Sequence, residues 1–158
     1  MRRRMLIARA LLHGPRLLLL DEPTVGLDPQ VRQDVWSLID GLRAEGVTVL
    51  MSTHYIEEAE RLADMVAVMA AGRVVALGPP AEVVRAHAGE TVVEVYGPPP
   101  RLAEVTEEGR RRGWVTRHRG TAVAILFAER LDGAAPEGEA RPASLEDAFV
   151  VLTGEEIE

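Results

Sequence analysis

A run of four leucines, Leu17–Leu20, ends in two adjacent carboxylates and a proline, Asp21-Glu22-Pro23. A continuous apolar run of this length is typical of a strand covered on both faces in a parallel sheet. Because α/β proteins bind ligands where such strands end, the sequence predicts a buried strand that delivers two acids to a site. One acid could hold Mg²⁺ while the next polarises water. The alternative is that the acids only end a strand and begin a turn.

A second buried strand is predicted over 47–51, after a helix over 31–44 that ends before Gly46. Ser52-Thr53-His54 follows this strand directly. In a parallel sheet His54 would then emerge at the same edge as Asp21 and Glu22, where an imidazole can donate to a phosphate oxygen. A single loop histidine can equally be an ordinary surface residue. Together, the two strand ends favour one side of a site for phosphate, magnesium and water.

The chain contains 18 arginines and no lysine. It therefore cannot contain a Gly-x-x-x-x-Gly-Lys-Ser/Thr loop, whose lysine reaches the phosphates that such acids serve. The sequence accordingly predicts half of an active site.

Composition excludes several other classes of function. Cysteine is absent, which rules out disulfides and thiolate metal sites. No apolar run approaches the 18 or so residues of a membrane span, so we expect a cytoplasmic protein. Residues 89–158 carry 8 arginines against 14 acids, and residues 1–88 carry 10 against 11. A basic stripe for nucleic acid is lacking, so no nucleic-acid partner is expected.

The chain divides by pattern into four segments. We expect strands and helices alternating up to residue 88, including a hairpin of 66–70 with 73–77 and a short helix that ends at His87. A β-α-β-β unit is predicted over 89–131. A mobile Gly- and Pro-rich linker is predicted over 132–143, and Ser144 would cap a final helix within 144–158. The elements expected besides those above are helices over 1–13, 56–63, 101–112 and 145–152, and strands over 91–96, 114–119 and 121–127.

Three segments together resemble the nucleotide-binding subunit of ABC transporters. They are Arg3–Leu11, Leu17–Pro29 and Ser52–His54, in the family's order and spacing over roughly the first 88 residues. The resemblance implies an α/β fold: a partial parallel-sheet core of the P-loop NTPase type with a small α+β C-terminal appendage. Residues 1–4 and 142–149 look like the drug-export branch of the family, although the tail also fits a plain amphipathic helix.

The resemblance also implies roles for individual residues. Asp21 would be the Walker B aspartate that binds Mg²⁺ through water, and Glu22 the catalytic base. His54 would sense the γ-phosphate of ATP, and Asp28 would lie in the D-loop that reaches across a dimer. ATP and Mg²⁺ are the implied cofactors. A membrane permease and a second ATP-binding subunit are the implied partners, with the protein peripheral at the inner face of the membrane.

The family's phosphate loop and its Leu-Ser-Gly-Gly stretch have no counterpart here. We therefore expect that this chain alone does not turn over ATP, and that Met1 is an internal residue of a longer protein or the start of a truncated product. The main hypothesis is the C-terminal part of an ABC exporter's ATPase subunit. The alternative is a non-catalytic interaction or dimerisation module derived from one. A soluble ABC-type ATPase acting on DNA or ribosomes is disfavoured by the missing basic stripe and coiled-coil heptads.

Overall fold

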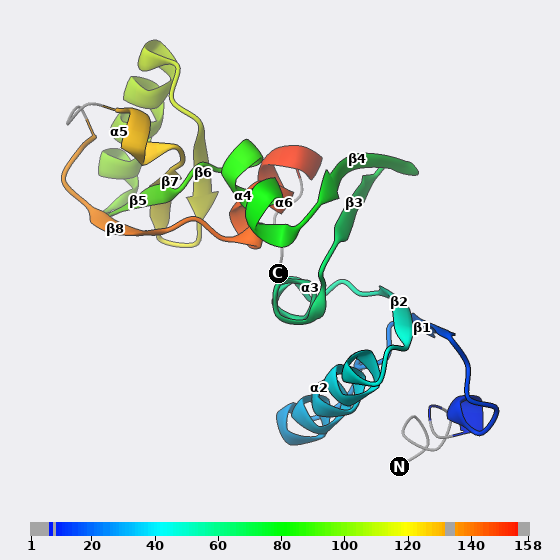
Figure 1. Ribbon diagram of the computed structural model, residues 1–158. Helices are drawn as coiled ribbons and strands as arrows, with labels where there is room; N and C mark the ends of the chain where they lie inside the picture. Colours follow the sequence, from blue (N-terminus) through cyan, green and yellow to red (C-terminus); the bar gives the residue numbers. More distant parts are fainter. Residues whose placement is uncertain (1–6, 8, 132–134, 155–158) are drawn as a thin grey trace. The chain divides into compact units, whose positions relative to one another are not determined.

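The computed structural model describes residue 7 and residues 9–131 and 135–154. The chain forms two compact units, unit 1 over Met1–Ala63 and unit 2 over Asp64–Glu158 (Figure 1). Of the helix predicted over 1–13, residues 7 and 9–11 are helical, and residues 1–6 and 8 lie outside the described part.

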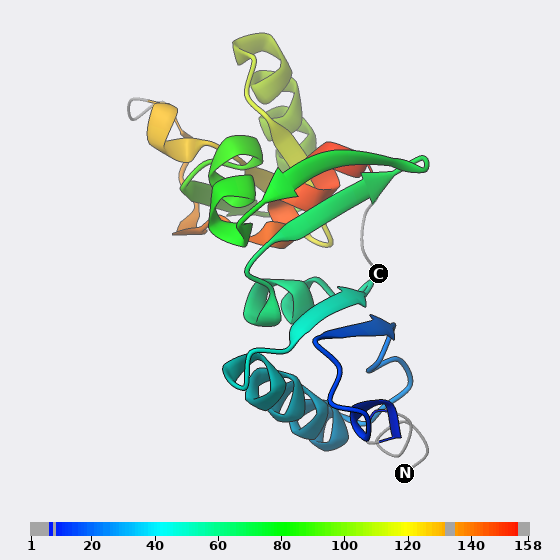
Figure 2. The same cartoon turned by 45° about the vertical axis from the view of Figure 1, so that its right-hand side comes forward.

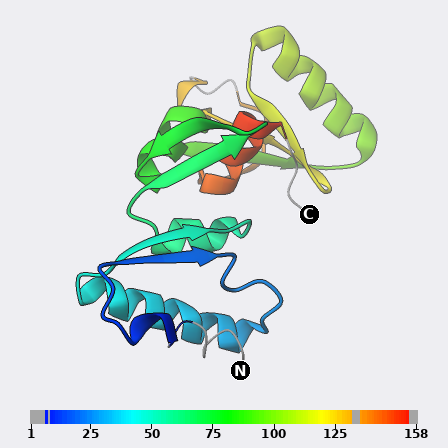
Figure 3. The same ribbon diagram turned by 90° about the vertical axis from the view of Figure 1, so that its right-hand side faces the viewer.

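Unit 1 is built on two parallel strands joined through a helix. Strands β1 (Leu17–Asp21) and β2 (Thr48–Ser52) pair in parallel, in a register that sets Asp21 opposite Ser52. Helix α2 (Pro29–Ala44) runs along the pair in Figure 3, and the short helix α3 (Ile56–Leu62) follows β2. The predicted order of strand, helix, strand and helix is confirmed.

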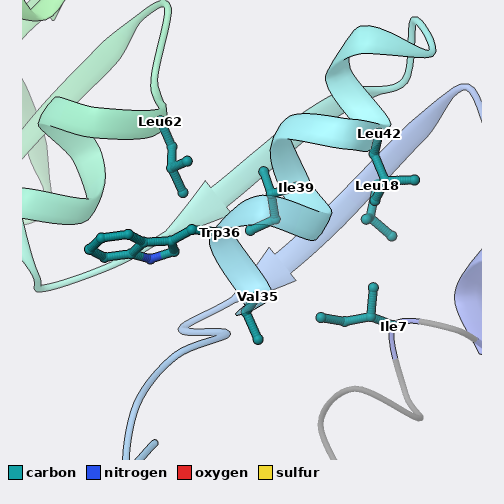
Figure 4. Packing of buried hydrophobic residues seen from close by; sticks show 7 residues of the cluster. All are labelled: Ile7, Leu18, Val35, Trp36, Ile39, Leu42 and Leu62. Atoms are coloured by element: carbon teal, nitrogen blue, oxygen red, sulfur yellow. The ribbon is translucent and has the colours of Figure 1, made fainter. Parts of the chain in front are cut away.

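Local sequence explains where α2 begins and ends. The carboxylate of Asp28 accepts a hydrogen bond of 3.0 Å from the backbone N–H of Val31, and Pro29 occupies the first turn, where a missing N–H costs nothing. Gly46 follows the helix with φ of 86°, a left-handed conformation that glycine adopts without strain. The buried side of α2 forms the core of unit 1 (Figure 4), composed of Ile7, Leu18, Val35, Trp36, Ile39, Leu42 and Leu62.

The strand pair is covered on one face, whereas the sequence predicted cover on both. Leu18 is 4% exposed and packs in the core. Its neighbours on the opposite face are open: Leu17 is 53% exposed, Leu19 66% and Leu50 65%. Successive strand residues point to opposite faces, and among the described residues only one of those faces is packed against a helix.

A buried polar contact joins α2 to α3. The indole Nε1–H of Trp36 donates to Oε1 of Glu58 over 2.8 Å, and both side chains are almost completely buried. The guanidinium of Arg61 lies 5.1 Å from the centre of the Trp36 ring. Since α3 directly follows the loop that carries His54, this contact ties that loop to the core.

Replacing Glu58 by alanine should therefore lower the free energy of unfolding by about 1–3 kcal/mol, because the Trp36 N–H stays buried without an acceptor. Glutamine keeps an acceptor oxygen at the same place, so E58Q should lose much less. Urea unfolding followed by circular dichroism measures both, with exposed Glu57 replaced by alanine as the control. An E58A variant as stable as E57A would contradict the prediction.

The described residues of unit 2 form a hairpin, a four-stranded sheet and three α-helices. Strands β3 (Val66–Ala70) and β4 (Arg73–Gly78) form the predicted hairpin around Ala71 and Gly72. The antiparallel sheet has the order β6-β7-β5-β8. Its strands are β5 (Thr91–Tyr96), β6 (Thr116–Arg119), β7 (Ala122–Ile125) and β8 (Glu139–Pro142); the helices are α4 (Pro80–His87), α5 (Pro99–Arg112) and α6 (Leu145–Thr153), with a 3-10 turn at Ala128–Arg130.

The boundary between the units differs from the one predicted at residue 89. Helix α6, from the end of the chain, packs against α4 and β3, which precede that residue (Figure 2). Elements from both sides of residue 89 therefore share one compact unit, which begins at Asp64. The predicted strands and helix of the β-α-β-β unit are present within it.

Part of the predicted linker is a strand. Residues 132–134 lie outside the described part, but β8 pairs antiparallel with β5 over four residues. Gly138 allows this approach, because a Cβ there would come within 2.6 Å of the carbonyl oxygen of Glu94. The capping of α6 by Ser144 is confirmed, with Ser144 and Asp147 exchanging hydrogen bonds in a capping box.

A network of charged side chains connects α6 to the sheet. Arg141 of β8 donates from Nε to Glu94 over 2.7 Å, and from Nη1 and Nη2 to the two oxygens of Asp147 over 2.6 and 2.9 Å. Arg119 contacts Glu94 at 3.1 Å, and Arg117 contacts Asp147 at 3.1 Å. Asp147 is fully buried, so its charge depends on these partners.

The network determines how its carboxyl groups titrate. Burial alone would raise the pKa of Glu94, but hydrogen bonds from Tyr96, Arg141 and Arg119 outweigh it and lower that pKa to about 2. Burial would also raise the pKa of Asp147. Hydrogen bonds from Arg141 and from Ser144 outweigh it, so the pKa of Asp147 lies below its ordinary value. Both groups are therefore carboxylates at neutral pH.

Candidate active site at the ends of β1 and β2

The polar residues predicted to meet at one sheet edge do so. Asp21 is the last residue of β1, Ser52 is the last residue of β2, and the parallel register sets them opposite one another. The hydroxyl of Ser52 donates a hydrogen bond to Oδ1 of Asp21. The backbone N–H of Glu22 lies 3.1 Å from the Ser52 hydroxyl and 3.1 Å from the Ser52 carbonyl oxygen.

Glu22 and His54 are in direct contact. Nδ1 of His54 lies 3.1 Å from Oε1 of Glu22, a distance at which the imidazole N–H donates to the carboxylate. Both side chains are about half exposed, so they are accessible to a ligand from solvent. The contact joins residues 32 positions apart, which confirms the predicted meeting of the two strand ends.

Backbone geometry turns Glu22 out of the strand direction. Its φ is 44°, in the left-handed region that is uncommon for residues other than glycine. The two acceptor oxygens of Ser52 bind the N–H of Glu22 in this conformation. Backbone of this kind persists where surrounding contacts hold it, and it often accompanies functional sites.

The loop that carries His54 is ordered by its own contacts. The backbone N–H of Tyr55 donates to Oγ1 of Thr53 over 3.0 Å. The Tyr55 ring lies 4.4 Å from that of His54, and the guanidinium of Arg32 stacks on Tyr55 at 4.5 Å from the ring centre. The imidazole is therefore packed against an aromatic ring that is itself held by a residue of α2.

Asp28 has a different environment. Its side chain caps α2 through the N–H of Val31, so in this structure it has the role of a helix N-cap. The role across a dimer interface that the resemblance implies stays a prediction. Ser52 was named in the sequence only as part of the loop after β2. Its place opposite Asp21 follows from the register of the folded strand pair, which the sequence pattern alone does not fix.

A cavity of about 320 Å³ adjoins the acids. Asp21, Glu22 and Pro23 line one side, and Ala10 and Leu19 contribute apolar surface. A larger cavity of about 690 Å³ lies in unit 2, lined by residues that include Leu102, Thr106 and His118, and contains none of the predicted site residues. The smaller cavity, which the two predicted acids line, is therefore the candidate ligand site.

The acids suit a magnesium ion better than a fully protein-bound metal. Among residues 7, 9–131 and 135–154, no three His, Asp or Glu side chains gather as a metal-binding group. Magnesium commonly keeps several waters and takes one or two carboxylates together with substrate phosphates, so a single carboxylate such as that of Asp21 is a sufficient protein contribution. Over the same residues, no helix has the length and apolar character needed to cross a membrane.

Comparison with known proteins identifies relatives along the whole chain, although no protein-family model matches it. Nod factor export ATP-binding protein I of Cupriavidus metallidurans is 43% identical over 99% of this chain and 54% of its own length. The protein of the same name from Burkholderia orbicola is 40% identical over 100% of this chain and 54% of its own. The chain is homologous to ABC transporter ATP-binding subunits. It spans about half the length of the curated relatives it matches.

This homology confirms the resemblance to ABC ATP-binding subunits and extends it. The sequence motifs supported about 88 residues, whereas the relatives match 99% of the chain or more, including unit 2. Among solved structures, CbiO1 of Clostridium perfringens, described as part of the ABC transporter complex CbiONQ, is 32% identical. Its TM-score is 0.47 over 66% of this chain and 41% of that one.

Proposed function

We propose that this chain is the part of an ABC exporter's ATP-binding subunit that supplies Asp21, Glu22 and His54 to ATP hydrolysis. The observation that carries the proposal is the 3.1 Å contact between His54 and Glu22, beside the hydrogen-bonded pair of Asp21 and Ser52. These residues come from two strand ends and are accessible from solvent, so a bound phosphate, Mg²⁺ and an attacking water could be positioned beside all of them.

Asp21, with Glu22 next to it, is the residue that would hold Mg²⁺ through water. When bound, the ion would offset negative charge on the phosphates of ATP. The hydrogen bond from Ser52 engages Oδ1 of Asp21 and keeps the carboxylate at the strand end. Asp21 therefore has a fixed position before any ligand arrives, and this lowers the cost of ordering the site.

Glu22 is placed to act as the general base. Its carboxylate is half exposed and can accept the proton of a water molecule that attacks the γ-phosphate. His54 orients that carboxylate through Nδ1. In the protonated ring both nitrogens carry hydrogen, so Nε2 would donate to a phosphate oxygen as negative charge develops there.

The relatives, which are named for the export of Nod factor, support a transport role in this proposal. In this proposal the intact protein energises the export of drugs or other small molecules through a membrane permease. It would act as a homodimer at the inner face of the membrane, with Asp28 at the interface between the two ATP-binding subunits.

The test is magnesium-dependent ATP hydrolysis by the protein as its source cells make it, isolated with an antibody against residues 141–154. The intact mass of the same preparation identifies which polypeptide carries the activity, against 17.2 kDa for the present chain. Release of phosphate that requires Mg²⁺ supports the proposal. A protein that releases none, yet copurifies with a membrane protein, would overturn it in favour of a non-catalytic interaction module.

A further inference from the structure

We infer that Ser52 is a positioning residue that fixes Asp21 and Glu22 together in the geometry needed for hydrolysis. The inference rests on the proposed function and adds a residue to it. Ser52 and Asp21 are opposed at the last position of the β1 and β2 pairing. No other side chain of β2 is opposite an acid of β1.

The hydroxyl of Ser52 makes two different contacts at once. A hydroxyl has one hydrogen to donate and lone pairs to accept with. Ser52 donates its hydrogen to Oδ1 of Asp21 and accepts from the backbone N–H of Glu22, 3.1 Å away. One side chain therefore sets the position of both acids, the proposed magnesium ligand Asp21 and the proposed general base Glu22.

The contact with Glu22 determines where its side chain goes. A non-glycine residue in the left-handed region is held there by surrounding contacts, and the N–H of Glu22 is bound by both the hydroxyl and the carbonyl oxygen of Ser52. In this conformation the carboxylate of Glu22 reaches His54 at 3.1 Å. Without the hydroxyl, the hydrogen bond from the backbone N–H of Glu22 to the Ser52 carbonyl remains, so the chain still folds, but this N–H keeps one of its two Ser52 acceptors.

The role predicts which substitutions are tolerated. Threonine keeps the hydroxyl and is well accommodated in a strand, whereas valine has the shape of threonine without the hydroxyl. Serine and threonine at position 52 should therefore support nearly full activity, and valine and alanine should lower it. Because the hydroxyl acts on the acids and not on ATP, the loss should fall on kcat and leave KM nearly unchanged.

The experiment compares S52T, S52V and S52A with the parent protein, each in the protein as the cell makes it, by steady-state ATP hydrolysis with Mg²⁺. We expect kcat to fall about 10–100-fold in S52V and S52A and to stay within about threefold in S52T. S37A is the matched control, since it removes a hydroxyl from α2 that donates to the carbonyl of Gln33. Urea unfolding of all variants tests whether any loss of activity reflects loss of folding.

The outcomes separate the two proposals. A parent protein with no ATP hydrolysis overturns the proposed function and, with it, the role of Ser52. An active parent whose S52V and S52T variants have the same kcat overturns only the role of Ser52. A rise in KM in S52V at unchanged kcat would likewise overturn it, because that pattern indicates a contact with the nucleotide.

Discussion

Replacing Glu22 by glutamine is expected to lower kcat for ATP hydrolysis by about 10²–10⁴-fold, the contribution typical of a positioned general base. Glutamine has nearly the same size and keeps an oxygen that accepts from Nδ1 of His54, so the contact of 3.1 Å can persist. What it loses is the ability to take a proton from water. The expected result is a protein that folds and binds nucleotide with little change in affinity, and that turns over very slowly.

Steady-state kinetics and a nucleotide-binding titration on the same preparation check this result. Glu45 provides the matched control, because it is an exposed acid at the end of α2, before the start of β2. E45Q should hydrolyse ATP at the rate of the parent protein. If E22Q retained most of that rate, Glu22 would not be the base, and the contact with His54 would have only a structural role.

The meeting of Asp21, Glu22 and His54 could be predicted from sequence because its causes are local. Two apolar strands that are separated by one amphipathic helix favour a parallel crossover connection. The carboxyl ends of parallel strands lie at the same edge of the sheet. The role of Ser52 depended on register. A slip of one residue would turn the hydroxyl to the other face, and the pattern of residues 47–52 does not fix that register.

Other features depend on contacts distant in sequence, and the prediction differed from the structure there. β8 contains no β-branched or aromatic residue and exists because Gly138 lets the chain approach β5 and Arg141 binds Glu94. The exposed Leu17 and Leu19 show the opposite case. Their apolar side chains predict burial. Burial also requires a second surface to pack against, and the residues of the strand do not specify that surface.

Replacing Arg141 by methionine should destabilise unit 2 by about 3–5 kcal/mol, the usual consequence of removing one partner from a buried ion pair. Methionine preserves most of the length of the side chain but none of its three hydrogen bonds to Glu94 and Asp147. Asp147 is fully buried and would keep Arg117 at 3.1 Å, which places the expected loss toward the lower end. Lysine restores the charge without the bidentate geometry, so the free energy of unfolding of R141K should lie between those of R141M and the parent protein.

The comparison with an exposed ion pair decides whether burial is the cause. Arg85 and Glu90 lie 3.7 Å apart with both side chains about two-thirds exposed, so R85M should cost less than about 1 kcal/mol. Urea unfolding gives the free energy, and hydrogen exchange of peptides from β5 and β8 locates the loss in unit 2. Suppose that R141M and R85M lowered the free energy of unfolding by the same small amount. The cost of desolvating the charged network would then equal the free energy gained from its contacts, and apolar packing alone would hold α6 to the sheet.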